Sequence, residues 1–299
     1  MSLGQHLTSG AISGFTSAIA LQPFDLLKTR LQQSDDHVRG RAPRNVFQVT
    51  KEILAKDGPL GLWRGTVPTL MRNVPGIAVY FSTLQKIRGV MSRTTYFSIP
   101  QTSRSTTTLP TISSQGNLIA GATTRVVIGI ILNPFSVLKA RFESGLYAYS
   151  GIGSALVSVY KAGPRELFKG AGASALRDAP YAGLFLYTYE AFKHDIPFLN
   201  ELPSTLQHVI AASSAGTIAT MATQPFDVLK TKIQVRQEQR YSSIQKAATA
   251  VWKQRGPLGF FDGASLRLSR KVASSAVAWA MYEGVLLFLK NQEDAKKLV

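Results

Sequence analysis

Long stretches without charge alternate with short amphipathic stretches along the chain, and this alternation predicts an all-helical protein. Residues 7–24 and 209–226 are runs of 18 residues without a charged side chain, and residues 116–138 repeat the pattern with Arg125 as the one interruption. At about 1.5 Å per residue, a helix of 18 residues spans roughly 27 Å, which is close to the thickness of the apolar core of a bilayer. These three runs therefore predict membrane-spanning helices.

Each run is followed by a charged segment, a short amphipathic segment and a second long apolar segment. Apolar residues three or four positions apart, such as Val49 and Ile53, predict that each amphipathic segment is a surface helix. The second apolar segments run from about residue 66 to 90, 171 to 193 and 264 to 290. The whole pattern predicts an all-α membrane protein with six transmembrane helices in three hairpins. Its mean hydropathy is only slightly positive, so part of each helix must face water or protein.

Two motifs show that the three hairpins are copies of one another. The first motif begins with Pro-Phe and has a basic residue at its sixth and eighth positions; its copies are residues 23–30, 134–141 and 225–232. The second ends in an aromatic residue, a polar residue and glycine, at 63–65, 168–170 and 261–263. We therefore expect repeats at 1–92, 111–197 and 198–299, joined into one integral domain, with a Ser/Thr-rich loop at 93–110. A unit near 100 residues present three times argues against a soluble α-solenoid, whose repeats are shorter and more numerous.

Composition excludes several classes of protein. The 299 residues include no cysteine and only four histidines, which show no metal-ligand spacing. No Ser/His/Asp constellation, phosphate loop or dinucleotide fingerprint is present, so we expect no enzyme, metal or cofactor. The net charge of +17 implies an anionic partner. The basic residues collect at helix ends and connecting segments without interleaved aromatic residues, which favours acidic lipid over nucleic acid. The start of the chain shows neither a secretory signal nor an Arg-rich presequence, so we expect an internal address.

The two repeated motifs together closely resemble those of the mitochondrial carrier family over the whole chain. The resemblance implies six tilted helices around a central cavity, with threefold pseudosymmetry and short amphipathic helices on the matrix side. It also implies a monomer in the mitochondrial inner membrane that moves a small solute by alternating access. The motif prolines remove a backbone donor and would bend the first helix of each repeat inward, closing one end of the cavity. These prolines are Pro23, Pro134 and Pro225.

Acidic and basic residues of the first motif resemble the matrix gate of the family. The resemblance implies that Asp25 pairs with Lys139 and that Asp227 pairs with Lys28. Ser136 stands where the second acid is expected, so Lys230 loses its partner and the gate has two bridges instead of three. An ion pair that opens to water contributes about 0 to 1 kcal/mol, so the missing bridge makes the closed gate easier to open. Residues at the brace position beneath the bridges are Gln32, Gln234 and, in the second repeat, Glu143.

Residues on the second helices resemble the gate at the cytoplasmic end of the family. In the second repeat, Glu190 and Lys193 fit the pattern, whereas the third repeat has Glu283 without the base. The first repeat has Gln85 and Arg88 and so lacks the acid. The pair Glu283–Arg88 alone would remain, which predicts a weak cytoplasmic gate.

Three arginines mark the expected substrate site, because each lies seven residues after a closing glycine. A charge inside a membrane helix is costly unless it faces water or a ligand, and a guanidinium holds a carboxylate with two parallel hydrogen bonds. These arginines are Arg72, Arg177 and Arg270. Asp178 follows Arg177, which resembles the amino-acid carriers of the family and predicts that Arg177 binds the carboxylate and Asp178 the ammonium of a zwitterion. The alternative is that the two side chains only neutralise each other. Arg125 either lies on the cavity side of its helix or extends to the membrane surface.

The segment 177–184, together with residues 21–30 and the polar loop, resembles the branch of the family that imports glycine for 5-aminolevulinate and haem synthesis. Small residues in it, Ala179, Ala182 and Gly183, suit a small substrate. Another amino acid, a small carboxylate and a nucleotide are the alternatives. The family also binds cardiolipin phosphates at the start of its second helices. The corresponding residues here are Arg64, Gly65, Lys169, Gly170 and Gly263, and Asp262 weakens the third of these sites.

Overall fold

The computed structural model describes residues 15–34, 45–94, 96, 113–194 and 204–277, and these residues form helices, turns and loops without a β-strand. Residues 15–20 are helical and lead into α2. The remaining elements of the first repeat are α2 (Gln22–Gln33), α3 (Val46–Asp57), η2 (Pro59–Trp63) and α4 (Thr66–Met91). The second repeat contains α5 (Ser114–Ile131), α6 (Asn133–Ser144), α7 (Ile152–Lys161), α8 (Pro164–Leu167) and α9 (Ala171–His194). The third contains α11 (Ser204–Ala222), α12 (Gln224–Val235), η3 (Gln239–Tyr241), α13 (Ile244–Arg255), η4 (Gly256–Phe261) and a helix over residues 264–277.

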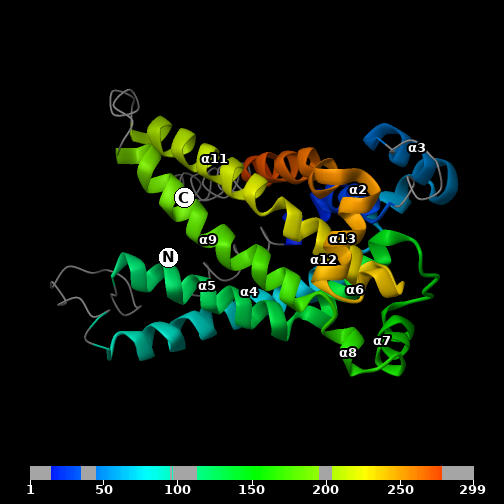
Figure 1. The fold of residues 1–299 in the computed structure, drawn as a ribbon, viewed down its shortest axis with the longest axis horizontal. Coiled ribbons are helices and arrows are strands. Elements are labelled where there is room, and N and C mark those ends of the chain that lie inside the picture. The colour runs from blue at the N-terminus through cyan, green and yellow to red at the C-terminus, as the bar shows by residue number, and fades with distance from the viewer. Residues whose placement is uncertain (1–14, 35–44, 95, 97–112, 195–203, 278–299) are drawn as a thin grey trace, which may run out of the picture.

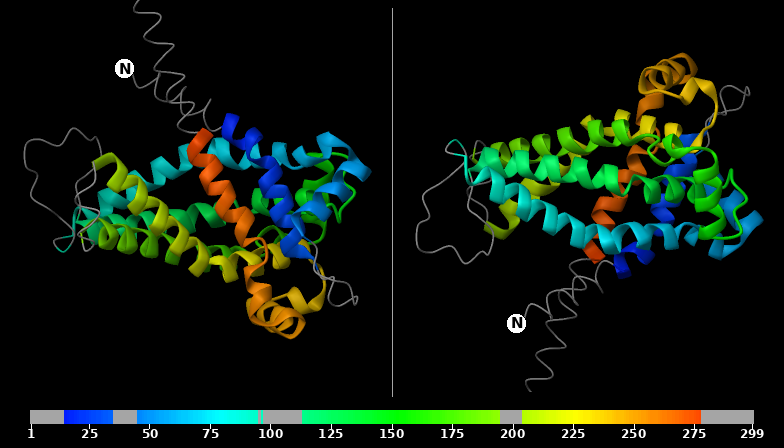
Figure 2. Two further views of the ribbon diagram at one scale, coloured as in Figure 1. Left: turned by 90° about the horizontal axis from the view of Figure 1, so that it is seen from above. Right: turned by 90° about the horizontal axis from the view of Figure 1, so that it is seen from below.

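The long helices form a bundle, and the short helices gather at one end of it. In Figure 1, α4, α5, α9 and α11 run along the long axis, while α3, α7, α8 and α13 lie at the right-hand end. Figure 2 shows the short helices at the same end in both further views. Taken one at a time, no described helix is both long and apolar enough to cross a membrane; Gln115–Ile131 and α6 together meet the requirement across a bend of 66°.

Helix breaks occur at all three motif prolines, as predicted. The regular helix pauses at one residue, Leu21, Leu132 or Thr223, and the next helix begins with proline in its first turn. Proline is tolerated there because the first amides of a helix have no partner within the helix. The breaks turn α2, α6 and α12 toward one another at the end of the bundle that carries the short helices (Figure 1).

Each amphipathic helix packs against the second half of the first helix in its own repeat. Buried side chains of α3, α7 and α13 meet buried residues of α2, α6 and α12 in three separate small cores. Val49 and Ile53 pack on Leu26 in the first core, and Ala155 and Val159 pack on Leu138 in the second. The three predicted surface helices are therefore confirmed, and they fix the positions of the helices that carry the charged motif.

Candidate functional site

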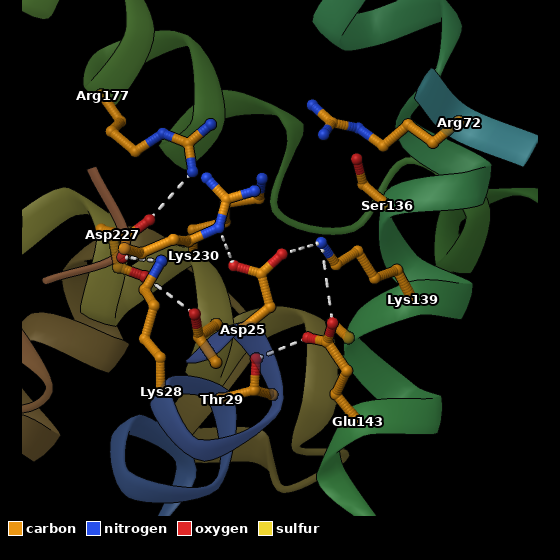
Figure 3. A pocket seen from close by; sticks show the side chains of 13 residues that line it. Asp25, Lys28, Thr29, Arg72, Ser136, Lys139, Glu143, Arg177, Asp227 and Lys230 are labelled. Atoms are coloured by element: carbon orange, nitrogen blue, oxygen red, sulfur yellow. Dashed lines mark hydrogen bonds and ion pairs between the residues drawn. The ribbon is translucent and has the colours of Figure 1, made fainter. Parts of the chain in front are cut away.

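A polar cavity lies where the three motif helices meet the beginnings of the second helices. Its volume is about 230 Å³, and Figure 3 shows it from close by. It is lined by Asp25, Lys28, Thr29, Arg72, Ser136, Lys139, Ala140, Glu143, Arg177, Asp227, Lys230, Thr231 and Arg270. Six of these side chains are basic and three are acidic, so the lining carries a positive excess. No group of three or more His, Asp or Glu side chains within the described part of the chain is arranged to hold a metal ion.

Two ion pairs join the repeats at the base of the cavity, and both were predicted from the sequence. Lys139 Nζ lies 2.6 Å from Asp25 Oδ2, and Lys28 Nζ lies 2.5 Å from Asp227 Oδ2. Asp227 is 1% exposed, and Asp25 is also buried. Buried carboxylates are stable only when they are paired and hydrogen-bonded, so these contacts hold the helix ends together.

The brace positions behave differently in the three repeats. Gln32 donates to Asp227 Oδ2 at 3.0 Å and accepts from Thr231 Oγ1, so it lies beneath a bridge as expected. Glu143 accepts hydrogen bonds from Thr29 at 2.7 Å and lies 3.6 Å from the Lys139 ammonium. Gln234 contacts no bridge among the described residues, because the lysine of its motif, Lys230, forms no ion pair there. The Gln234 amide donates to Asn133 Oδ1 and to the carbonyl of Lys169.

Ser136 and Lys230 form no bridge, in agreement with the sequence. Within the described residues, no hydrogen bond or ion pair involves either side chain, although both line the cavity. The nearby charges that act on Lys230 are the cations of Arg177 and Arg72 and the acids Asp178 and Asp227. The third of the three symmetry-related positions therefore has no ion pair of its own among the described residues.

The three arginines expected at the substrate site all line this cavity, and two of them are already bonded to the gate. Arg177 Nη1 donates to Asp227 Oδ1 at 2.9 Å, and its Nε donates to Asp178 Oδ1 at 2.8 Å. Arg270 pairs with Asp25. Among the residues that the structure describes, Arg72 has no such partner, and its buried Nε makes no hydrogen bond. The spacing from the closing glycines thus located the arginines, but it did not predict that they would reach the gate acids.

Two other residues expected at the substrate site lie outside the cavity lining. Asp178 lies beside the cavity, and its carboxylate is bonded to Arg177, as the alternative of mutual neutralisation describes. Arg125 is exposed on α5 and does not line the cavity, because α5 ends at Ile131 and only its continuation α6 reaches the charged centre.

Three buried amides, one in each repeat, were not predicted from the sequence. The residue before each motif proline is an amide that donates to the backbone near the closing glycine of its own repeat: Gln22 to Arg64 O, Asn133 to Leu167 O and Lys169 O, and Gln224 to Asp262 O. All three side chains are fully buried. The sequence contains a sign of these amides, because Gln or Asn precedes the motif proline in every repeat.

The closing glycines are required by backbone conformation and by close approach of a neighbouring repeat. Gly65, Gly170 and Gly263 have φ values of +97°, +75° and +72°, which L side chains rarely adopt. A Cβ on Gly65 would lie 2.9 Å from Glu143 Cγ, and one on Gly170 would lie 2.8 Å from Gln234 Cγ. Each second helix therefore begins against the brace residue of another repeat.

Basic residues expected to bind lipid lie near the closing glycines. Arg64 is 3.9 Å from Asp57, and Lys169 is 3.1 Å from Glu166. Asp262, which was expected to weaken the third lipid site, is paired with Arg255. The residue types at these positions allow a phosphate to be held, and their role stays a prediction.

Glu166 lies in α8, one of the short helices, and the pKa of its carboxyl group is lowered. Burial alone would raise the pKa of its carboxyl group. The hydrogen bond and charge of Lys169, together with those of Arg141, more than offset burial and hold the pKa below its ordinary value of 4.5. Glu166 therefore stays ionised and binds the buried guanidinium of Arg141.

The expected cytoplasmic gate is described only in part. Gln85 and Glu190 are exposed, and Arg88 is half-buried. Glu283 and the side chain of Lys193 lie outside the described residues. The expected pair between Glu283 and Arg88 therefore stays a prediction.

Comparison with known proteins agrees with this arrangement. A family model described as mitochondrial carrier protein matches residues 1–95, 110–198 and 201–293. The chain therefore belongs to the mitochondrial carrier family, and it is a transporter, not an enzyme.

Among curated proteins, the chain is 51% identical to the mitochondrial glycine transporter of Laccaria bicolor, over 97% of this chain and 98% of the relative. It is 38% identical to proteins of the same name from Mycosarcoma maydis and Aspergillus niger. These alignments cover 93% and 97% of this chain, and 82% and 92% of the relatives.

Proposed function

We propose that this carrier imports glycine across the mitochondrial inner membrane into the matrix, where it supplies 5-aminolevulinate and haem synthesis. The name shared by the relatives supports glycine as the substrate. The main observation behind the proposal is the small cavity of about 230 Å³, which is lined by Arg72, Arg177 and Arg270. A cavity of this size suits a small solute, and its positive excess attracts a carboxylate.

Transport proceeds by alternating access across six membrane-spanning helices. Ion pairs close the base of the cavity on the side that carries the short helices, so this conformation has its matrix gate shut. Opening that gate requires separation of Lys139 from Asp25 and of Lys28 from Asp227. The protein acts as a monomer, and cardiolipin phosphates bind at the turns near Arg64 and Lys169.

Uptake of labelled glycine into liposomes that contain the purified protein tests the proposal. The unmodified protein is expected to take up glycine. Arg177→Ala is expected to abolish uptake because it removes a cation from the cavity, and Asp178→Asn because it removes the acid expected to bind the ammonium group of glycine. Lys253→Gln is the matched control, because Lys253 is exposed on α13. Thermal unfolding of each variant in detergent separates loss of transport from loss of folding. Absence of glycine uptake, with transport of a larger amino acid, a dicarboxylate or a nucleotide instead, would reject glycine and leave membership of the family unaffected.

A further inference from the structure

The proposed gate has three sectors, one for each motif position at which an acid is expected (25, 136 and 227). In two of them, the contacts of the acid follow the same cyclic order of repeats. Asp25 of the first repeat binds Lys139 of the second and Arg270 of the third. Asp227 of the third repeat binds Lys28 of the first and Arg177 of the second. Each acid thus receives a lysine from the following repeat and an arginine from the preceding one.

The same rule assigns Lys230 and Arg72 to the acid of the second repeat, but that position is Ser136. Both cations line the cavity, and within the described residues neither forms an ion pair. The Nε atom of Arg72 is buried without an acceptor. Figure 3 shows Arg72 on the same side of the cavity as Ser136, with its guanidinium directed into the cavity.

The part of the cavity beside Ser136, Arg72 and Lys230 has the chemistry of a carboxylate site. It offers a guanidinium, an ammonium and a hydroxyl group, all of which donate hydrogen bonds to an anion. Like charges repel strongly where water is scarce, so two neighbouring cations favour an anion between them. The charge of Asp178 acts on both cations, but its carboxylate is bonded to Arg177. Arg177 is less available as a donor to a substrate carboxylate, because its Nε and Nη1 already donate to Asp178 and Asp227.

We propose that the carboxylate of the substrate binds between Arg72, Lys230 and Ser136 and completes the third sector of the gate. This inference rests on the proposed function, and it moves the carboxylate from Arg177 to the sector where the protein lacks its own acid. Ser136 leaves the space that an aspartate side chain would fill. The bound substrate therefore provides the carboxylate partner for a lysine and an arginine that Asp25 and Asp227 provide in the other two sectors.

Lys230→Gln is the first test. Since Lys230 forms no ion pair with any acid in the described part of the chain, a purely structural role predicts unchanged transport. The inference predicts that the half-saturation concentration for glycine rises at least tenfold, which corresponds to about 1.4 kcal/mol of lost binding. The maximal rate and the thermal stability change much less. Lys253→Gln is the control for the chemical change. Glycine uptake by Lys230→Gln with unchanged half-saturation would overturn the inference and leave the proposed function intact.

Ser136→Asp is the second test, because it builds the missing acid into the chain. The new carboxylate occupies the site and raises the half-saturation concentration at least tenfold, whereas Ser136→Asn, which is similar in size and uncharged, changes it less than threefold. A variant that only strengthens the gate would instead lower the maximal rate at unchanged half-saturation. That outcome would refute a carboxylate site at this position.

Simple ligands distinguish the substrate from an inorganic anion and test the site without transport. Acetate is expected to raise the unfolding temperature of the unmodified protein at constant ionic strength, but not that of Lys230→Gln, and glycinamide is expected to protect neither. Protection by chloride equal to that by acetate would overturn the assignment to the substrate carboxylate. Acetate protection that requires Lys230, in a protein that does not take up glycine, would support the site and reject the proposed function alone.

Discussion

Replacement of Gln22 by leucine is expected to destabilise the protein because it removes a buried amide that links the first two repeats. The Gln22 side chain is 0% exposed and makes three hydrogen bonds to other parts of the chain. Its Nε2 donates to Arg64 O at 3.1 Å and to Glu143 Oε1 at 3.0 Å, and its Oε1 accepts from Thr69 Oγ1 at 3.0 Å. Gln22→Leu keeps the approximate volume and removes all three bonds.

The magnitude follows from the groups that lose their partner. A buried neutral group left without a hydrogen bond costs about 1–3 kcal/mol, and a hydrogen bond to a charged group contributes about 1.5–3 kcal/mol. Because Glu143 keeps Thr29 and Lys139 as partners, the effects are not fully additive. We expect a total loss of about 3 kcal/mol, which corresponds to a fall in unfolding temperature of roughly 6–12 °C.

Thermal unfolding of the purified protein in detergent measures this loss. Gln237→Leu makes the same chemical change at an exposed position and is expected to alter the unfolding temperature by less than about 2 °C. If Gln22→Leu unfolds within 2 °C of the unmodified protein, the buried amide is not a structural link between the first two repeats. A double variant with Glu143→Gln should lose less than the sum of the single losses, because the two residues share a bond.

Two further predictions concern the turns that begin the second helices and the ion pairs of Glu166. Gly170→Ala is expected to lower stability by about 1–2 kcal/mol, since φ is +75° and the new Cβ would lie 2.8 Å from Gln234 Cγ. The control is Gly153→Ala, which lies in α7 with open space around it and should leave stability unchanged or raise it by up to about 1 kcal/mol. Equal unfolding temperatures for the two variants would contradict the prediction. Glu166→Gln is expected to remove about 1 kcal/mol near neutral pH. Because the pKa of Glu166 is depressed in the folded protein, its stabilisation is complete above the ordinary value of 4.5 and is lost as the pH falls through the folded pKa. Chemical denaturation at neutral pH and at a pH below the folded pKa measures the difference in unfolding free energy between Glu166→Gln and the unmodified protein. An equal difference at the two pH values would contradict the assignment of the Arg141 ion pair.

The repeated motifs predicted the helices and the partners of the gate, because both depend on local chemistry and on threefold symmetry. The breaks at the motif prolines follow from the missing amide hydrogen, and the pairs Lys139–Asp25 and Lys28–Asp227 follow once the repeats are placed around one axis. The absence of a partner for Lys230 follows from Ser136 by the same reasoning.

Contacts between different motifs could not be predicted in this way. The sequence indicates that Arg177 faces the cavity, but only the packing of α9 against α12 shows that its guanidinium reaches Asp227. The position of Arg125 depended equally on tertiary structure, because helical periodicity gives a direction on α5 but not the depth of the cavity. The three buried amides were predictable in part, since Gln or Asn precedes each motif proline, although their carbonyl partners lie 34 to 42 residues away.

A second layer of contacts joins the repeats, including the two whose described residues form no ion pair at the third gate position. The last basic residue of each motif donates to a backbone carbonyl of another repeat: Arg30 to Glu143 O at 2.7 Å, Arg141 to Gln234 O at 3.4 Å and Lys232 to Ser34 O at 3.0 Å. These bonds need no acidic partner, so Ser136 does not affect them. The contact of Arg141, which crosses the sector without the ion pair, is the longest of the three, and the hydroxyl of Tyr147 donates to Val235 O at 2.6 Å beside it. The contacts between the second and third repeats are therefore kept although Ser136 supplies no acid, which is the condition that the proposed anion site requires.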